Sequence, residues 1–462
     1  MIRYRLLGLF LAASLAACGG GGGGGDGVVP SACSAGAEKN FVRDVTYEWY
    51  LFPDLLPASV STSQFDTAQQ LLDFMTAVAR AQGKDRYFSY VTTKQADSSF
   101  LQEGEFIGFG FRVRIEGDRV FFMEVFENSP ASAAGISRGA ELLAVDSGSG
   151  YVAVSNILPS DPNLTNAFGP ATEGVVRGFR FTKDGILSER SLTKRIVTIQ
   201  PIPDDGVKVL TLPSNPSFKV GYVNLRTYIT TAGSPLRNAF SQFRAEGIEY
   251  FVVDLRYNGG GLISVAELMG DLFGQQRTGS DLYSRLAFRA SKASNDILHY
   301  FQPQPESVNP VSIAFITTGG TASASEMTVN SMKPWANVAI VGTDTYGKPV
   351  GQSAFDLSER CDTRLRLVTL RGTNRDGEGD YYDGLAQTLP GKACSATDNL
   401  SRAMGDPLES STAEALFWLG TGACSAVMGG APVAQKPGIE AEIRYPVPDR
   451  PSVAQVHLPG LF

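Results

Sequence analysis

Ser323 lies in the sequence GGTASASEM (residues 319–327), between an apolar run that predicts a strand and an apolar stretch that predicts a helix. A serine at such a turn places its hydroxyl at a helix N-terminus, where the helix dipole favours developing negative charge. The small neighbouring side chains leave room for a peptide backbone. Ser323 is therefore a candidate nucleophile, although a serine at this position is also common as a plain helix cap.

Lys348 lies in a second segment, YGKPVGQ (residues 346–352), after another apolar run at residues 338–341. Glycine and apolar neighbours can desolvate the amine, and desolvation lowers its pKa, so a neutral lysine could take the serine proton. The alternative is an ordinary surface lysine. The only two histidines are His299, in an apolar stretch, and His457, in the irregular last part of the chain. Neither lies in a motif with turn glycines, so the lysine is the better candidate base.

Three consecutive glycines close a third segment, DLRYNGGG (residues 254–261), which follows a strongly apolar run. Glycine permits backbone conformations that turn N–H groups outward, as an oxyanion hole requires. A simple turn is the alternative. A phosphate-binding loop is disfavoured because no Gly-Lys-Ser/Thr follows.

Residues 218–460 alternate predicted strands with helices, and this pattern predicts an α/β sheet with functional residues at the carboxyl ends of its strands. Strands are expected at 220–225, 250–255, 311–316 and 338–341, with a helix face marked by Leu236, Phe240 and Phe243. The three segments above follow three of these strands, so we expect them to meet at one edge of the sheet.

A small β-rich domain is predicted before this core. Two strands, at 106–113 and 120–125, precede SPASAAGI (129–136) and a further strand ending at Asp146, and the order resembles a PDZ domain. Glycines in such a domain turn backbone N–H groups toward one point, where the terminal carboxylate of a peptide can bind. A tight strand entry is the alternative. The candidate peptide-binding loop consists of Gly108, Phe109, Gly110 and Phe111.

The N-terminus resembles a bacterial lipoprotein signal. Arg3 and Arg5 precede a short apolar run, and LAAC (15–18) resembles a lipobox with Cys18 as the lipidated residue. The run is too short to span a bilayer, so a signal peptide over 1–17 is predicted, an ordinary secretory signal being the alternative. Several acyl chains on one residue would anchor the protein stably. Because no Asp follows the cysteine, we expect the outer membrane of a Gram-negative cell, facing the periplasm or the cell surface.

Four further cysteines would lie in an oxidising compartment, and their even number permits two disulfides in three connectivities. The first pairing that we expect is Cys361 with Cys394, which leaves Cys33 to pair with Cys424. Free buried thiols are the alternative. A zinc site is disfavoured because the sequence has no CxxC and only two histidines.

Composition agrees with a globular, acidic protein. Hydrophobic residues make up 43% and charged residues 19% of the 462 residues. Removal of the signal would reduce the 40 basic residues to 38, against 47 acidic ones. A negative balance without basic runs argues against nucleic acid as a partner.

Together the three segments resemble the carboxyl-terminal processing (tail-specific) proteases and their tricorn-core relatives. The 25-residue spacing between the serine and the lysine matches that family. The resemblance implies a serine endopeptidase with a Ser323/Lys348 dyad, Gln352 orienting the amine, and no metal or organic cofactor. Backbone amides of Gly260 or Gly261 and of Ala324 would form the oxyanion hole. Substrates would be proteins with apolar C-terminal tails, and the alternative is an inactive binding protein on the same fold.

The expected fold class is therefore a multidomain α/β protein with a ClpP/crotonase-like core. Pro349 departs from the family pattern and could alter the strand that carries the lysine. Oligomeric state and any adaptor cannot be predicted from these residues. The expected organisation is a signal peptide (1–17), lipidated Cys and glycine-rich tether (18–32), N-terminal helical domain (33–103), PDZ-like domain (104–200), catalytic domain (201–430) and irregular tail (431–462).

Overall fold

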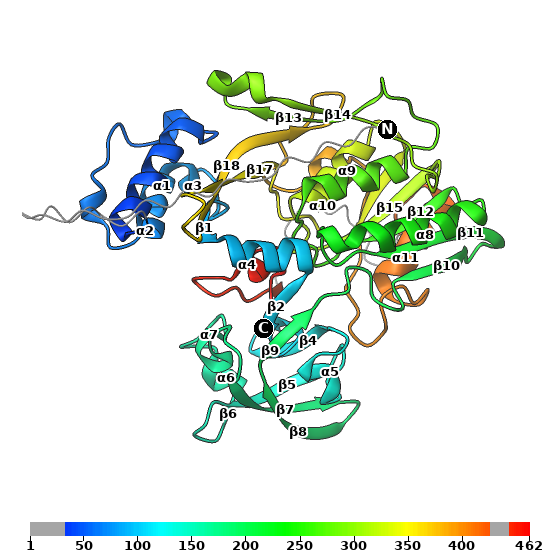
Figure 1. Ribbon diagram of the computed structural model, residues 1–462. Coiled ribbons are helices and arrows are strands. Elements are labelled where there is room, and N and C mark those ends of the chain that lie inside the picture. The colour runs from blue at the N-terminus through cyan, green and yellow to red at the C-terminus, as the bar shows by residue number, and fades with distance from the viewer. Residues whose placement is uncertain (1–32, 426–442) are drawn as a thin grey trace, which may run out of the picture.

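The computed structural model describes residues 33–425 and 443–462. The predicted signal peptide, Cys18 and the tether lie outside these residues. No helix in the two described stretches combines the length and apolarity that crossing a bilayer requires. Figure 1 shows an N-terminal helical layer, a central α/β core and a β-rich domain below it. The mixed α/β, multidomain fold class expected from the sequence is confirmed.

A six-stranded sheet forms the centre of the α/β core, in the order β10-β11-β12-β15-β16-β19. All of its pairs are parallel except β10 with β11. Its central strands are buried on both faces, which explains their continuous apolar sequences. Its members are β10 (Val207–Leu212), β11 (Asn215–Asn224), β12 (Tyr250–Asp254), β15 (Ser312–Thr317), β16 (Asn337–Gly342) and β19 (Ala393–Ser395).

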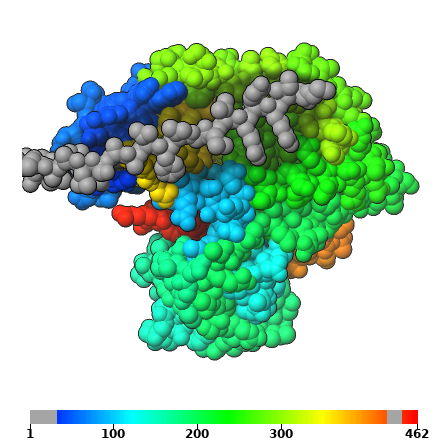
Figure 2. All heavy atoms as spheres, viewed as in Figure 1, coloured from blue at the N-terminus to red at the C-terminus, as the bar shows by residue number. Residues whose placement is uncertain are grey.

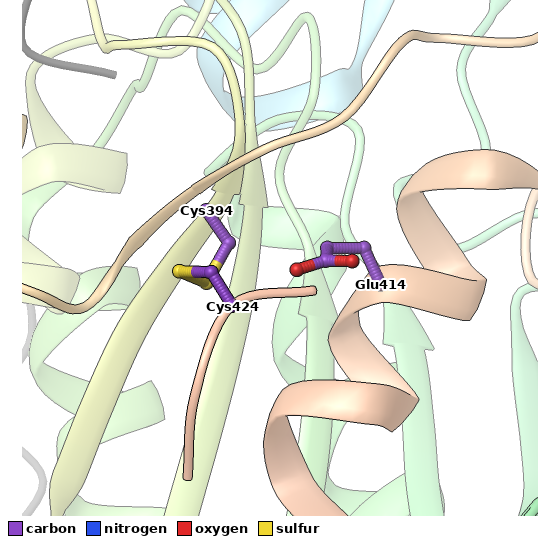
Figure 3. A group of neighbouring side chains, drawn as sticks. All are labelled: Cys394, Glu414 and Cys424. Atoms are coloured by element: carbon purple, nitrogen blue, oxygen red, sulfur yellow. A yellow bond between two sulfur atoms is a disulfide. The ribbon is translucent and has the colours of Figure 1, made fainter. Parts of the chain in front are cut away.

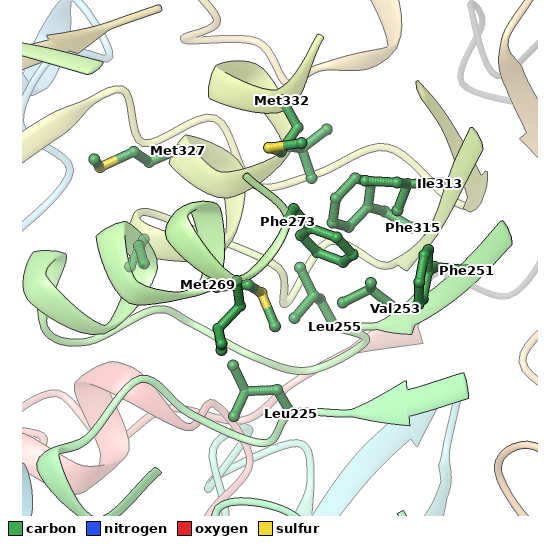
Figure 4. Packing of buried hydrophobic residues seen from close by; sticks show 14 of the residues in the cluster. Leu225, Phe251, Val253, Leu255, Met269, Phe273, Ile313, Phe315, Met327 and Met332 are labelled. Atoms are coloured by element: carbon green, nitrogen blue, oxygen red, sulfur yellow. The ribbon is translucent and has the colours of Figure 1, made fainter. Parts of the chain in front are cut away.

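Helices pack on both faces of this sheet (Figure 1). On one face, Phe251, Val253 and Phe315 contact side chains of the covering helices, and Figure 4 shows this packing from close by. On the other face, Trp418 belongs to a second apolar cluster with strand residues. The covering helices are α8 (Gly233–Ala245), α9 (Ile263–Leu272), α10 (Ala324–Met332) and α11 (Ser410–Thr421).

A second, antiparallel sheet joins the core to the N-terminal helices, because β1 pairs with β18 along its whole length. Helix α1 begins at the cap Ser34, whose side chain accepts a hydrogen bond from Ala37 N, and α2 begins with a capping box. The elements of this layer are α1 (Ala35–Trp49), α2 (Ala68–Met75), α3 (Ala77–Ala81), β1 (Tyr90–Thr93), β13 (Leu282–Phe288), β14 (Ile297–Tyr300), β17 (Val350–Asp356) and β18 (Thr363–Thr373).

The β-rich domain has its own core of packed phenylalanines. Its main sheet runs β20-β3-β4-β5-β7-β8, and β2 pairs separately with β9. A tight turn at residues 117–118 joins β3 to β4. Its elements are α4 (Lys94–Ser98) at the entry, β2 (Glu105–Gly108), β3 (Phe111–Glu116), β4 (Arg119–Val125), α5 (Pro130–Ala133), β5 (Glu141–Asp146), β6 (Tyr151–Ala153), α6 (Val154–Ile157), α7 (Thr165–Phe168), β7 (Val176–Lys183), β8 (Ile186–Thr193) and β9 (Arg195–Thr198).

The last part of the chain returns to the β-rich domain. The stretch that we expected to be irregular contains β20 (Ile443–Arg444) and the short helix α12 (Val453–His457). In Figure 1 this segment lies between the β-rich domain and the rest of the molecule. The amino-acid pattern, rich in proline and glycine, gave no periodic signal for these elements.

All four cysteines of the described part form disulfides, but the expected pairing is wrong. The bonds join Cys33 to Cys361 and Cys394 to Cys424. Cys394 lies in β19 of the parallel sheet, whereas Cys361 lies in the turn between β17 and β18 of the other sheet. Helix α1 packs against β18 and brings Cys33 to that turn. Figure 3 shows the Cys394–Cys424 disulfide, with the side chain of Glu414 beside it.

We expect the double variant Cys394→Ala, Cys424→Ala to unfold more easily by about 3 kcal/mol, because the bond closes a loop of 30 residues. Thermal denaturation of the parent and the variant measures this difference, with the reduced parent as the control. Mass mapping of a non-reduced digest checks the pairing, and a peptide that links Cys361 to Cys394 would contradict the structure.

Candidate active site

The three sequence segments meet at one edge of the parallel sheet. They follow β12, β15 and β16, which are neighbours, and the carboxyl ends of parallel strands lie at the same edge. Ser323 and Lys348 line the same small pocket. The placement expected from the strand pattern is therefore found in the structure.

Ser323 occupies the turn between β15 and α10 in a backbone conformation that only glycine adopts easily, with φ 57° and ψ −115°. Such strain is typical of functional turns that present one side chain. Ser323 is partly exposed while its neighbours Ala322 and Ala324 are buried. The hydroxyl can therefore be approached from the pocket.

Gly260 packs directly against this turn. A β-carbon on Gly260 would lie 2.8 Å from Ser323 Cβ and 2.9 Å from Ala324 N, so only glycine fits. The N–H of Gly260 donates to Asn258 Oδ1 at 2.9 Å. In the described part of the chain, the N–H groups of Gly261 and Ala324 have no hydrogen-bond acceptor. Of the two candidate glycines, Gly261 is therefore the one with a free donor.

Lys348 is 5% exposed, and its ammonium lies 4.8 Å from the centre of the Phe88 ring. Burial lowers the pKa of Lys348 to about 8. Its Nζ donates to Gln352 Oε1 at 3.3 Å, and no hydrogen bond joins it to Ser323 Oγ in the described residues. Catalytic hydrogen bonds are often long before substrate binds.

Gln352 is held from both sides. A register shift in the pairing of β17 with β18 occurs between Gly351 and Gln352, and such bulges re-aim side chains. The Gln352 amide nitrogen donates to the carbonyl oxygen of Phe88, which leaves its oxygen to face the lysine. Pro349 lies just before β17 begins at Val350, so the substitution noted in the sequence does not interrupt the strand.

Glu326 links the serine turn to the lysine segment, a role that the sequence did not predict. Its buried carboxylate accepts hydrogen bonds from Ser323 N at 2.9 Å, Gly347 N at 2.7 Å and Lys348 N at 2.8 Å. The Thr345 hydroxyl donates to it at 2.6 Å. Burial raises the pKa of Glu326, and these four donors oppose that shift. Its position three residues after a serine at a helix start was the available signal, since Glu is common there.

The N-terminal layer also contributes to the site. Besides Phe88, Arg86 donates to the carbonyl oxygens of Tyr346 and Gly347, next to the lysine. From the sequence, this region is expected only to be part of the N-terminal helical domain (33–103). Contacts of this kind span about 260 residues and leave no local pattern.

A cluster of charges joins the β-rich domain to the glycine segment. Asp398 pairs with Arg114 at 2.6 Å, with Arg138 at 2.6 Å and with Arg256 at 2.8 Å. Arg256 precedes Tyr257, whose hydroxyl also donates to Asp398. Burial would raise the pKa of Asp398, but the three arginines outweigh it and lower the pKa. The position of the β-rich domain is thereby tied to the loop that carries the candidate oxyanion donors.

The predicted peptide-binding loop lies at the start of β3. Gly110 and Phe111 direct their N–H groups toward the edge of that strand, whereas the Phe109 carbonyl accepts from Ala131 N. Gly108 ends β2 and pairs with Arg195 of β9. The structure thus gives the loop two donors aimed at one point, from Gly110 and Phe111.

Neither histidine offers an alternative base. His299 lies in β14 and contacts Asp271 at 3.1 Å. His457 is buried close to the site, stacked on Phe100, and burial lowers its pKa to about 3. Lys348 lines the pocket with Ser323 and neither histidine does, so Lys348 remains the candidate base.

Comparison with known proteins agrees with the fold and the motifs. Residues 219–386 match the family model described as peptidase family S41. The chain is 25% identical over 261 residues to a carboxyl-terminal-processing protease of Synechocystis sp., covering 55% of this chain and 56% of that one. It is also 25% identical over 309 residues to a probable CtpA-like serine protease of Staphylococcus saprophyticus, covering 64% of this chain and 56% of that one. The resemblance to the processing proteases is confirmed.

These matches span little more than half the length of the curated relatives. A putative S41 protease from Bacteroides fragilis has the same fold, with a TM-score of 0.65 and 20% identity. The similarity covers 82% of this chain and 97% of that structure.

We expect Glu326→Gln to destabilise the protein by about 2–4 kcal/mol, because the amide NH₂ must face buried N–H donors that then lose an acceptor. Urea denaturation measures the change. The control is Glu246→Gln, which breaks a surface pair with Lys219 and should cost less than about 1 kcal/mol. Equal effects of the two substitutions would contradict the linking role of Glu326.

Proposed function

We propose that this chain is a serine endopeptidase that uses Ser323 as nucleophile and Lys348 as general base. The observation that carries the proposal is a buried amine with a lowered pKa in the same pocket as a strained, accessible serine. A neutral lysine is a competent base for a serine hydroxyl. A protein that only binds ligands has no use for a desolvated lysine held by Gln352.

The reaction follows from this arrangement. Neutral Lys348 accepts the Ser323 proton while the oxygen attacks a peptide carbonyl. The N–H groups of Gly261 and Ala324 bind the oxyanion, and each donor contributes about 3 kcal/mol in comparable sites. The lysine ammonium then protonates the leaving amine, and water hydrolyses the acyl-enzyme. Gln352 keeps the amine directed into the pocket by accepting one of its hydrogens.

The pocket beside Ser323 supports a preference for small apolar side chains at the cleaved bond. Its volume is about 20 Å³, which is room for about one water molecule. Most of its wall is apolar, and its apolar side chains include Ile263, Leu286, Met327, Val350, Leu370 and Tyr381. A large side chain would require these residues to move.

The substrates that we propose are extracytoplasmic proteins whose apolar C-terminal tails bind the β-rich domain. The convergent N–H groups of Gly110 and Phe111 support tail binding, because such groups bind a carboxylate. Two disulfides support an oxidising compartment. The lipobox-like sequence at Cys18 supports a lipid anchor, and we propose the outer membrane, facing the periplasm or the cell surface.

The direct test is cleavage of an unfolded protein that bears an apolar C-terminal tail, followed by mass spectrometry. We expect cleavage by the parent and none by Ser323→Ala, with the melting temperature of the variant nearly unchanged. Ser325→Ala is a matched control, because the Ser325 hydroxyl is buried and bonded to Asn258 O. Cleavage by Ser323→Ala would overturn the assignment. No cleavage by a folded parent would favour a binding protein on this fold.

The activity should depend on pH through Lys348. Below a pKa of about 8 the amine is protonated and cannot accept the serine proton. We therefore expect kcat/KM to fall about tenfold per pH unit below that value and to level off above it. Initial rates between pH 6 and 9.5 measure the profile, and Lys348→Ala should be inactive throughout. A profile that is flat over this range would contradict a lysine base.

A further inference from the structure

Residues 459–462 lie along β3 as an added strand. The Val113 N–H donates to Gly460 O at 2.9 Å, and the Phe462 N–H donates to Phe111 O at 3.0 Å. Arg112 and Leu461 face each other in an antiparallel bridge. Farther along the same edge, β20 pairs with Ile115 and Glu116. The edge that a bound peptide would extend is therefore covered by this chain itself.

The oxygen of Phe462 lies where the carboxylate of a bound tail would lie. The N–H groups of Gly110 and Phe111 both donate to it, at 3.0 and 3.4 Å. A β-carbon on Gly108 would lie 2.9 Å from the carbonyl carbon of Phe462, so a side chain there would exclude the segment. These are the donors that the sequence marks as a peptide-binding loop.

The Phe462 side chain fills an aromatic pocket. It is 4% exposed and packs edge-on against Phe168, with ring centroids 4.6 Å apart. Phe109, Phe111 and Leu164 belong to the same buried cluster. Burial of a whole phenylalanine side chain contributes about 1.5–3 kcal/mol, so the pocket selects a large apolar residue at the ligand position that Phe462 occupies.

We propose that residues 459–462 act as a built-in ligand of the β-rich domain and close its groove until a substrate tail displaces them. The groove then accepts peptides that end in a large apolar residue, phenylalanine above all. This proposal rests on the tail recognition proposed above. Strand addition, the two converging donors and the filled side-chain pocket are three separate features of peptide binding, and the segment provides all of them.

The segment and His457, two residues before it, contact the catalytic loop. His457 O accepts a hydrogen bond from Gly259 N at 3.0 Å. Arg112 donates to Pro459 O at 2.9 Å and to Tyr257 O at 2.6 Å through one nitrogen. Figure 2 shows part of the last stretch of the chain, in red, at the junction between the β-rich domain and the layers above it. Displacement of the segment would therefore remove Pro459 O, one of the acceptors of Arg112, whose guanidinium also donates to the loop that carries Gly261.

The test uses the full chain with Ser323→Ala, which cannot cleave a bound peptide. The probe is a fluorescein-labelled peptide with the sequence of residues 456–462, VHLPGLF, and binding is followed by anisotropy. If the segment closes the groove in nine molecules of ten or more, Phe462→Ala should bind the probe about tenfold more tightly than the parent. The amidated probe should bind less tightly than the free acid. Phe417→Ala, which alters an exposed ring on α11, should bind like the parent.

Equal affinity of the parent and Phe462→Ala would overturn the proposal. So would a Phe462→Ala variant that melts far below the parent and binds nothing, because the segment would then be a structural strand. Hydrogen exchange on the parent gives a second measurement, since excess unlabelled peptide should speed exchange at residues 460–462. Unchanged exchange at peptide saturation would contradict displacement.

Activity separates this proposal from the peptidase assignment. With Ser323 intact, Phe462→Ala should raise kcat/KM for substrates ending in phenylalanine and leave those ending in aspartate unchanged. Tighter peptide binding without cleavage by any form would sustain the built-in ligand and reject the peptidase. If Phe462→Ala changes neither cleavage nor peptide binding, the peptidase assignment stands and the built-in ligand is rejected.

Discussion

The buried carboxylate of Glu326 fixes the geometry on which the site depends. The nucleophile turn and the lysine segment follow different strands, and within residues 33–425 and 443–462 Glu326 is the only side chain that bonds to the backbone of both. A buried carboxylate that loses its donors is costly, so the two loops must keep their spacing. The strained φ of Ser323 is supported by the same bond. The chemistry of the serine and the lysine is thus prepared by a residue that reacts with nothing.

Much of this arrangement could be predicted because it depends on short segments of consecutive residues. The apolar runs that become β12, β15 and β16 predict neighbouring strands, and each motif follows its strand directly. The roles of Phe88, Arg86 and Asp398 could not be predicted, because these residues reach the site through contacts across long stretches of sequence. The disulfide pairing failed for the same reason: three connectivities were open, and packing of α1 against β18 decided between them. The order in the last twenty residues was missed because a strand added to another domain needs no periodic pattern of its own.

Recognition and catalysis share one set of contacts at the base of the β-rich domain. Arg112 spans from the added strand to Tyr257, and Arg138 spans from β4 and Asp398 to the hydroxyl of the same tyrosine. Tyr257 itself has a positive φ of 68° just before the glycines. Replacement of the added strand along β3 would therefore alter contacts of Tyr257, whose backbone is already strained. Buried charge clusters of this kind have few equivalent arrangements, so the two domains are held in a defined orientation.

The disulfide between Cys33 and Cys361 has a mechanical consequence. Cys33 is the first residue that the structure describes, and its bond leads directly into the turn between β17 and β18. A pull on the chain before Cys33 would be transmitted to that hairpin and would bypass helix α1. The load would then act on the hydrogen-bonded pair β17 and β18 before it acts on helix α1. A protein attached to a surface through the chain before Cys33 could therefore bear a pulling force without its N-terminal helices unfolding first.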